Sequence, residues 1–138
     1  MKCKSILVAD DNRDVRETIV DALKDEGYHA LGAKDGKDAL AKLADMPVPT
    51  LILLDLMMPV MSGWEFLDAQ KSNAKFASHQ VITISSVNPT KTLETTEPLD
   101  IAGSLQKPLS FGSLWDKVQE FCETPMPASS GGQKDLNP

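Results

Sequence analysis

Five polar side chains end, or directly follow, short runs of residues that have the pattern of buried β-strands. They are two neighbouring aspartates, a lone aspartate, a serine and a lysine: Asp10, Asp11, Asp55, Ser85 and Lys107. In an open parallel sheet, ligands bind beyond the carboxyl ends of the strands. We therefore expect three carboxylates, a hydroxyl and an ammonium group to converge at one edge of a sheet. Surface decoration alone seldom produces such a pattern.

Three carboxylates held close together repel one another, and a hard divalent cation with oxygen ligands relieves that repulsion. Mg²⁺ fits best, because one or two carboxylates plus water and phosphate oxygens satisfy it. A metal ion beside a carboxylate can shield its charge, so that its oxygen can attack an electrophilic phosphorus. Asp55 stands alone after a central strand, which favours it as the nucleophile, while Asp10 and Asp11 are better suited to holding metal. Lys107 and the Ser85 hydroxyl would then bind phosphoryl oxygens.

The elements that must position these residues alternate along the chain. Apolar runs predict strands, and apolar residues at helical spacing predict helices. The predicted strands are 6–9, 29–33, 51–54, 80–85 and 104–106, and the predicted helices are 13–26, 35–46, 62–72 and 111–122. Ser62 and Glu65 have the spacing of a capping box. Strands that alternate with helices indicate parallel pairing, because each crossover helix covers a face of the sheet.

Two segments do not fit that alternation. Residues 88–100 are rich in threonine and contain two prolines, so we expect only a short or irregular helix there. Residues 123–138 contain three prolines and a Ser-Ser-Gly-Gly run, which predicts a disordered tail or linker. The expected organisation is therefore one domain over residues 1–122, followed by that tail.

Composition excludes several classes of protein. The 138 residues carry 14 Lys and Arg against 20 Asp and Glu, a formal net charge of −6, which argues against a general nucleic-acid binder. No apolar run approaches the ~20 residues of a membrane span, and the N-terminus has no signal-peptide core. The two cysteines, Cys3 and Cys122, show no metal-binding spacing, so we expect reduced thiols, in the core or at its edge, in a cytoplasmic protein. His29 and His79 have no partner pattern and are expected at the surface.

Four blocks of residues together resemble the receiver domain of two-component response regulators, of the chemotaxis-receiver type. The blocks are Val8-Ala9-Asp10-Asp11, Asp55-Leu56-Met57-Met58-Pro59 with Gly63, Ser85-Ser86, and Lys107-Pro108. Their order and spacing agree with that family over about residues 4–122. The resemblance implies an α/β fold in which a five-stranded parallel sheet is doubly wound, in the flavodoxin-like arrangement of receivers.

The resemblance also implies a function. A sensor histidine kinase or a histidine phosphotransfer protein would donate the phosphoryl group of its phosphohistidine to Asp55, in a Mg²⁺-dependent reaction. The phosphorylated chain would signal to a downstream protein through a conformational switch, without contact of this domain with nucleic acid or membrane. Such a domain is a phospho-acceptor that catalyses its own phosphorylation and dephosphorylation rather than an enzyme acting on other substrates.

Roles for individual residues follow from the same resemblance. Asp11 would bind the metal directly and Asp10 largely through water, together with Asp55 and the backbone carbonyl of Met57. Ser85 matches the switch hydroxyl of the family. Lys107 matches the lysine that pairs with the phosphoryl group, and the family has a cis bond at the position before Pro108.

The sequence departs from the family pattern at three places. Ser104 stands where the family usually has an aromatic switch residue, and the irregular 88–100 segment stands where it has its fourth helix. Output is therefore expected through another surface or through ordering of that segment. Met57 and Val87, two residues beyond Asp55 and Ser85, are apolar and cannot orient a hydrolytic water. We therefore predict a long-lived aspartyl phosphate.

Two other functions compete with this interpretation. A phosphatase or phosphotransferase of the haloacid-dehalogenase type needs a second aspartate two residues after the first, and Met57 occupies that place. A receiver-like scaffold that binds partners without phosphorylation is disfavoured by the complete set of acids, hydroxyl and lysine, although Ser104 and the 88–100 segment leave it open. A third alternative, flavodoxin-like cofactor binding, is disfavoured because the sequence has no phosphate-cradling loop after the first strand.

Overall fold

The structure is a computed structural model that describes residues 3, 5–47, 49–74, 76–85 and 101–122, with Ser85 described only by its place in a strand. The predicted irregular helix at 88–100 and the predicted tail at 123–138 lie outside the described residues. None of the described helices has the length and apolar character that crossing a bilayer requires.

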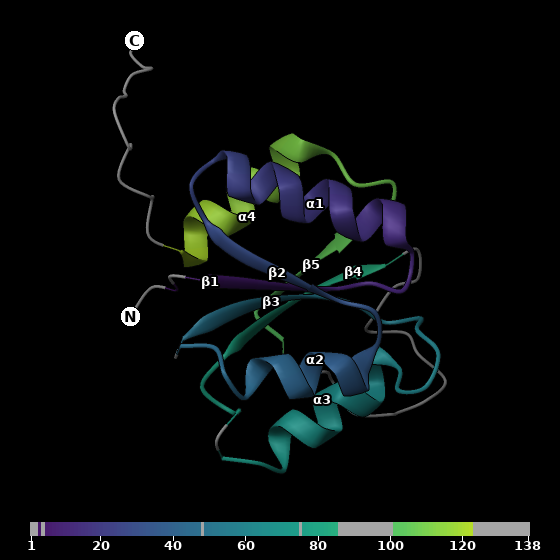
Figure 1. Cartoon of the computed structure of the whole chain (residues 1–138). Coiled ribbons are helices and arrows are strands. Elements are labelled where there is room, and N and C mark those ends of the chain that lie inside the picture. The colour runs from purple at the N-terminus through teal and green to yellow at the C-terminus, as the bar shows by residue number, and fades with distance from the viewer. Residues whose placement is uncertain (1–2, 4, 48, 75, 86–100, 123–138) are drawn as a thin grey trace, which may run out of the picture.

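From β1 to β4 and again after β5, strands and helices alternate in the described residues as the sequence predicts. The five strands are β1 (Ser5–Ala9), β2 (His29–Ala33), β3 (Thr50–Asp55), β4 (Gln80–Ser85) and β5 (Gly103–Gln106), and the helices are α1 (Arg13–Asp25), α2 (Gly36–Leu43), α3 (Gly63–Lys71) and α4 (Phe111–Phe121). All strand pairs are parallel, in the order β2-β1-β3-β4-β5. Because helices lie on both faces of this parallel sheet (Figure 1), the prediction of a doubly wound sheet is confirmed.

The sheet separates two apolar layers, with α1 and α4 on one face and α2 and α3 on the other (Figure 1). Alternate residues of the central strand β3 point to opposite layers: Leu51 and Leu53 pack toward the α1 side, and Ile52 and Leu54 toward the α2 side. Every residue of β1 and β3 is buried, which explains why residues 6–9 and 51–54 are continuously apolar.

Side chains cap the first turn of every described helix. Asn12, Asp35, Ser62 and Ser110 each accept a hydrogen bond from a backbone N–H of the helix that they precede. The predicted capping box is present, because Glu65 also accepts a hydrogen bond from the Ser62 N–H at 2.9 Å. These caps end each turn that follows a strand and so set where the following helix begins.

The two cysteines are joined, which corrects the expectation of reduced thiols. Cys3 and Cys122 form a disulfide across 119 residues of sequence, and both are almost completely buried. The Cys3 N–H also donates to the Phe121 carbonyl at 3.0 Å. A sequence separation of this size gives no local signal, so only the return of α4 to the start of β1 brings the two thiols together.

His79 is buried, and its expected place at the surface is therefore wrong. Its side chain is 4% exposed, and its Nδ1 atom accepts a hydrogen bond from the Thr50 N–H at 2.8 Å. The Gln70 amide donates to the His79 carbonyl at 2.8 Å. The histidine therefore joins the start of β3 to α3 inside the protein. His29 is exposed, as predicted.

Candidate metal and phosphoryl site

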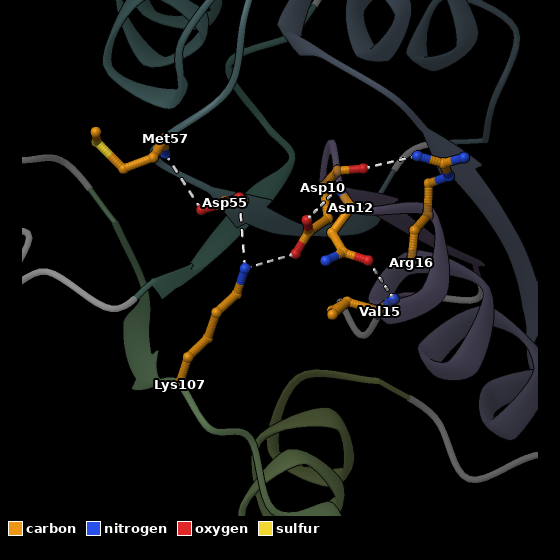
Figure 2. A network of polar contacts seen from close by, with 7 residues as sticks. All are labelled: Asp10, Asn12, Val15, Arg16, Asp55, Met57 and Lys107. Atoms are coloured by element: carbon orange, nitrogen blue, oxygen red, sulfur yellow. Dashed lines mark hydrogen bonds and ion pairs between the residues drawn. The ribbon is translucent and has the colours of Figure 1, made fainter.

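Three residues that the sequence singles out meet at the carboxyl edge of the sheet. Asp10 directly follows β1, Asp55 is the last residue of β3, and Lys107 directly follows β5. Figure 2 shows the side chains of all three pointing toward one another. The parallel order of the strands explains this convergence, because every strand ends at the same edge.

The acidic part of the site contains a third carboxylate. Asp10, Asp11 and Asp55 each offer a carboxylate oxygen, and these three oxygens lie within 4.8 Å of one another. Asp10 is 0% exposed and Asp55 is 4% exposed, whereas Asp11 is exposed to solvent. Two of the three charges are therefore held away from water and close to a third.

This crowding changes the acidity of Asp55. Burial and the neighbouring charge of Asp10 raise the pKa of Asp55 from 3.8 to about 6, against the opposite effects of the Met57 N–H and Lys107. The Met57 N–H donates to Asp55 Oδ1 at 3.2 Å. The carboxylate of Asp55 is thus destabilised in the protein alone, and any added positive charge at the site would stabilise it.

Lys107 supplies the cation of the site. Its Nζ atom lies 3.0 Å from Asp10 Oδ2 and 3.5 Å from Asp55 Oδ2. Burial lowers the pKa of Lys107, but the carboxylates of Asp10 and Asp55 outweigh burial and raise it overall. The peptide bond between Lys107 and Pro108 is cis, as the resemblance implies.

Hydrogen bonds of Asp10 hold the turn between β1 and α1. The Asp10 N–H donates to the Ala33 carbonyl of β2 at 3.0 Å, and Asp10 Oδ1 accepts from the Asn12 N–H at 2.9 Å. Arg16 donates from Nη1 to the Asp10 carbonyl at 2.9 Å. Sequence reasoning missed Arg16. The available signal was its place one turn after the Asn12 cap, since long helical side chains point back toward the N-terminus.

The loop after β3 is closed by a glycine of the matched motif. A Cβ atom at Gly63 would lie 2.7 Å from both the Asp55 carbonyl oxygen and Leu56 Cα, so only glycine allows α3 to begin this close to the site. Val60 in the same loop has a φ of 69°, an unfavourable conformation for a β-branched residue. The loop that carries Met57 is therefore tightly folded against the end of β3.

The other described residues that the sequence analysis names lie in strands or loops as follows. Ser85 is the last residue of β4, opposite Gln106 in the register of the sheet, and so ends at the same edge as Asp55. Met57 lies in the loop after β3 with its side chain exposed. Ser104 lies in β5 opposite Thr83 and is exposed. Val87 lies outside the described residues.

These residues fit a hard divalent cation. All three acids offer oxygen ligands, which Mg²⁺ prefers. Within the described part of the chain, the buried Oδ2 atom of Asp10 has no polar partner besides the Lys107 ammonium group. A group of carboxylates with incomplete pairing in a buried position can bind a cation and, beside it, the oxygens of a phosphoryl group.

Comparison with known proteins agrees with the geometry. The family model described as the response regulator receiver domain matches residues 6–119. The response regulator receiver protein CpdR of Brucella abortus is 40% identical over 123 residues, which cover 86% of this chain and 96% of that protein. Response regulator RR06 of Streptococcus pneumoniae is 38% identical over 115 residues, which cover 83% of this chain but only 51% of RR06.

Solved structures share the fold. The response regulator protein TrrA of Thermotoga maritima, solved in complex with Mg²⁺-BeF, has a TM-score of 0.71 and 28% identity over 86% of this chain and 98% of that one. The chain spans about half the length of several curated relatives that it matches, with 51%, 59% and 55% of three of them covered. What those longer proteins do as a whole is therefore not carried over to this chain.

Proposed function

Since the chain belongs to the receiver domain family of two-component response regulators, we propose that it accepts a phosphoryl group on Asp55 from a phosphohistidine, in a Mg²⁺-dependent reaction. The observation that carries the proposal is the position of Asp55, at the end of β3 and close to both the buried carboxylate of Asp10 and the ammonium group of Lys107. Receiver domains are phospho-acceptor domains rather than classical enzymes, and they pair with histidine kinases and with downstream effectors.

The transfer is a substitution at phosphorus. An oxygen of Asp55 forms the new P–O bond while the P–N bond of the phosphohistidine breaks, and the electron pair of that bond leaves with the imidazole, which takes up a proton. The Lys107 ammonium group, 3.5 Å from Asp55 Oδ2, is close enough to bind a phosphoryl oxygen on the acyl phosphate. We assign the same role to the Ser85 hydroxyl from the position of this residue at the end of β4.

We assign the cation ligands to Asp10, Asp11, Asp55 and the backbone carbonyl of Met57. When bound, Mg²⁺ would supply positive charge that offsets the repulsion between the carboxylates and the incoming phosphoryl group. The raised pKa of Asp55 supports this assignment, because a carboxylate destabilised by burial and by its neighbour gains most from an added cation.

We further propose that the acyl phosphate is long-lived. Hydrolysis requires a water molecule oriented toward phosphorus, and Met57 offers only an apolar side chain beside Asp55. Val87, two residues beyond Ser85 in the sequence, is also apolar and cannot orient a water molecule. Loss of the phosphoryl group within seconds from the isolated protein in Mg²⁺ would contradict this part of the proposal.

The proposal includes the setting of the domain. We assign residues 1–122 to the receiver and 123–138 to a tail or linker. We expect a sensor histidine kinase or histidine phosphotransfer protein as donor and a protein as target, in the cytoplasm. The Cys3–Cys122 disulfide is uncommon in a reducing compartment. Thiol trapping in cells that express the chain tests that location, and a fully oxidised pair would count against it.

The deciding experiment is incubation with a small acyl phosphate donor and Mg²⁺, followed by intact-mass analysis. We expect the mass of one added phosphoryl group in the wild type and none in Asp55→Asn. Asp21→Asn, which removes an exposed carboxylate from α1, is the matched control and should react as the wild type does. No gain of mass with any donor would overturn the proposal and favour the scaffold function.

A further inference from the structure

The residues around the acidic site include one cation that touches none of the carboxylate oxygens. Arg16 lies on α1, one turn after the Asn12 cap, and its guanidinium donates from Nη1 to the backbone carbonyl of Asp10 at 2.9 Å. Figure 2 shows the side chain extending along the turn toward that carbonyl. No ion pair joins Arg16 to an acidic side chain within the described residues.

The path of the Arg16 side chain depends on a glycine in the neighbouring strand. A Cβ atom at Gly32 of β2 would lie 3.0 Å from both Cγ and Cδ of Arg16 and 3.5 Å from its Nε. Gly32 does not have a positive φ, so its backbone conformation does not demand glycine. The absent side chain at position 32 therefore leaves the space in which the arginine stem lies.

The hydrogen bond from Arg16 means that neighbouring elements hold both backbone polar groups of Asp10. The N–H of Asp10 is held by Ala33 of β2, and its carbonyl is held by Arg16 of α1. That carbonyl belongs to the peptide plane between Asp10 and Asp11, so its orientation also fixes the position of the Asp11 Cα atom, from which the Asp11 side chain extends. Asp11 is exposed and contributes one of the three clustered carboxylates.

We propose that Arg16 is a positioning residue, which orients the Asp10–Asp11 peptide so that both carboxylates face the cation site and thereby sets the affinity for a divalent cation. This inference rests on the proposed function, because it concerns the same acidic site. Groups that orient metal ligands without touching the metal are worth about 10- to 100-fold in metal affinity.

Electrostatics and positioning predict opposite signs, which makes the inference testable. Arg16 is positively charged, so its removal lowers the repulsion felt by an incoming cation and by charge alone would strengthen binding. If the arginine acts by holding the peptide, its removal weakens binding instead. The sign of the change in Mg²⁺ affinity therefore separates the two effects.

The experiment is an NMR titration with MgCl₂ and no phosphodonor, following amide shifts of wild type, Arg16→Gln, Arg16→Lys, Gly32→Val and Arg13→Gln. We expect Arg16→Gln to bind Mg²⁺ about tenfold more weakly, with Arg16→Lys between it and the wild type. Gly32→Val keeps the guanidinium but fills the space of its stem, so it should also weaken binding. The double variant with both Gly32→Val and Arg16→Gln should bind Mg²⁺ only slightly more weakly than Arg16→Gln alone, because both changes break the same contact.

Arg13→Gln is the matched control. This substitution removes the same charge from the same helix, but Arg13 is exposed and paired with Glu17 at 2.9 Å. The Mg²⁺ affinity of the Arg13→Gln variant should therefore stay at the wild-type value or rise slightly. Amide spectra in the absence of Mg²⁺ verify that each variant is folded. Equal affinities for folded Arg16→Gln and Arg13→Gln, or wild-type affinity in folded Gly32→Val, would overturn the inference. Absence of Mg²⁺ binding by the wild type would instead overturn the proposed function.

Discussion

The two edges of the sheet differ in whether their buried polar groups are paired within the protein. At the amino edge, the Ser5 and Thr50 hydroxyls share a hydrogen bond of 2.7 Å, and the Thr50 N–H is satisfied by His79. At the carboxyl edge, Asp10 and Asp55 are buried near Asp11, and the Lys107 ammonium group lies between them. The amino edge is closed by neutral pairs, and the carboxyl edge retains unbalanced negative charge.

One sheet can therefore serve both stability and function at its two edges. Neutral hydrogen bonds formed within the protein leave nothing for a ligand to satisfy. Clustered carboxylates cost folding free energy and keep the capacity to bind a cation and a phosphoryl group. We therefore expect substitutions at the amino edge to destabilise the fold without touching the chemistry, and neutralising substitutions at the carboxyl edge to abolish the chemistry while stabilising the fold.

The largest expected effect is at the disulfide near the amino edge. Reduction of Cys3–Cys122 releases a loop closed across 119 residues and should lower the free energy of unfolding by about 3 to 5 kcal/mol. Denaturant titration with and without reductant measures this change. Cys122→Ser should have the same free energy of unfolding as the reduced wild type, and this value should not change when reductant is added. The reduced wild type and Cys122→Ser should both still gain the mass of a phosphoryl group. Loss of this gain on reduction would contradict the idea that the amino edge contributes to stability without affecting the chemistry at the carboxyl edge.

The next effect is at His79. Replacing it with alanine leaves the buried Thr50 N–H without its partner and opens a cavity, so we expect a loss of about 3 kcal/mol in unfolding free energy. The exposed His29→Ala is the matched control and should change stability little. Denaturant titration of both variants at neutral pH provides the comparison. Equal stabilities would show that the amino edge does not depend on this hydrogen bond.

Acidity should affect the two edges in opposite directions. Burial lowers the pKa of His79 below its unfolded value of 6.5, so below that pH the unfolded chain binds more protons and this group's contribution to stability is lost. Asp55 has its pKa raised from 3.8 to about 6, so between these values the folded protein binds more protons and its stability falls as pH rises.

Neutralising Asp55 should therefore stabilise the metal-free protein. We expect Asp55→Asn to gain about 2 kcal/mol or less at pH 7, because loss of the ion pair with Lys107 offsets part of the relief. Unfolding measured from pH 4 to pH 7 in a chelator should show that the gain shrinks toward pH 4. Destabilisation of Asp55→Asn at pH 7 would contradict the idea that this edge stores unfavourable charge.

The smallest expected effect is in the loop beside the site. Val60 has a φ of 69° and is 76% exposed, so its side chain contributes strain without burial. Asparagine tolerates this conformation better, and Val60→Asn should raise the unfolding free energy by less than about 1 kcal/mol. Thermal unfolding of Val60→Asn beside Val60→Ala tests this, since alanine should bring no such gain. An equal gain in both variants would show that the backbone conformation is not the cause.

The site was predictable to the extent that it follows from strand ends. Asp10, Asp55 and Lys107 each follow or end an apolar run, and the parallel order of the strands brings them to one edge. The helix cap at Ser62 was also predictable, because it depends on neighbours within one turn. The structure brings the three strand-end residues together, but the chemical roles of all the predicted site residues, including Ser85 and Met57, stay predictions.

Contacts made across the fold were not readable in the same way. His79 carries no local sign of burial, because its partner Thr50 is 29 residues away. The two cysteines are further apart still, so their pairing depends on where α4 ends relative to the start of β1. The route of the Arg16 stem depends on the missing side chain of Gly32 in another strand.

The sequence by itself therefore determined the order of strands and helices, the edge of the sheet that would carry charge, and the family, because hydrophobic periodicity and motif spacing are properties of neighbouring residues. Only the tertiary structure decided which polar groups are satisfied and which are left to a ligand. That division depends on distances between segments far apart in the chain, and burial turns those distances into differences in pKa and stability.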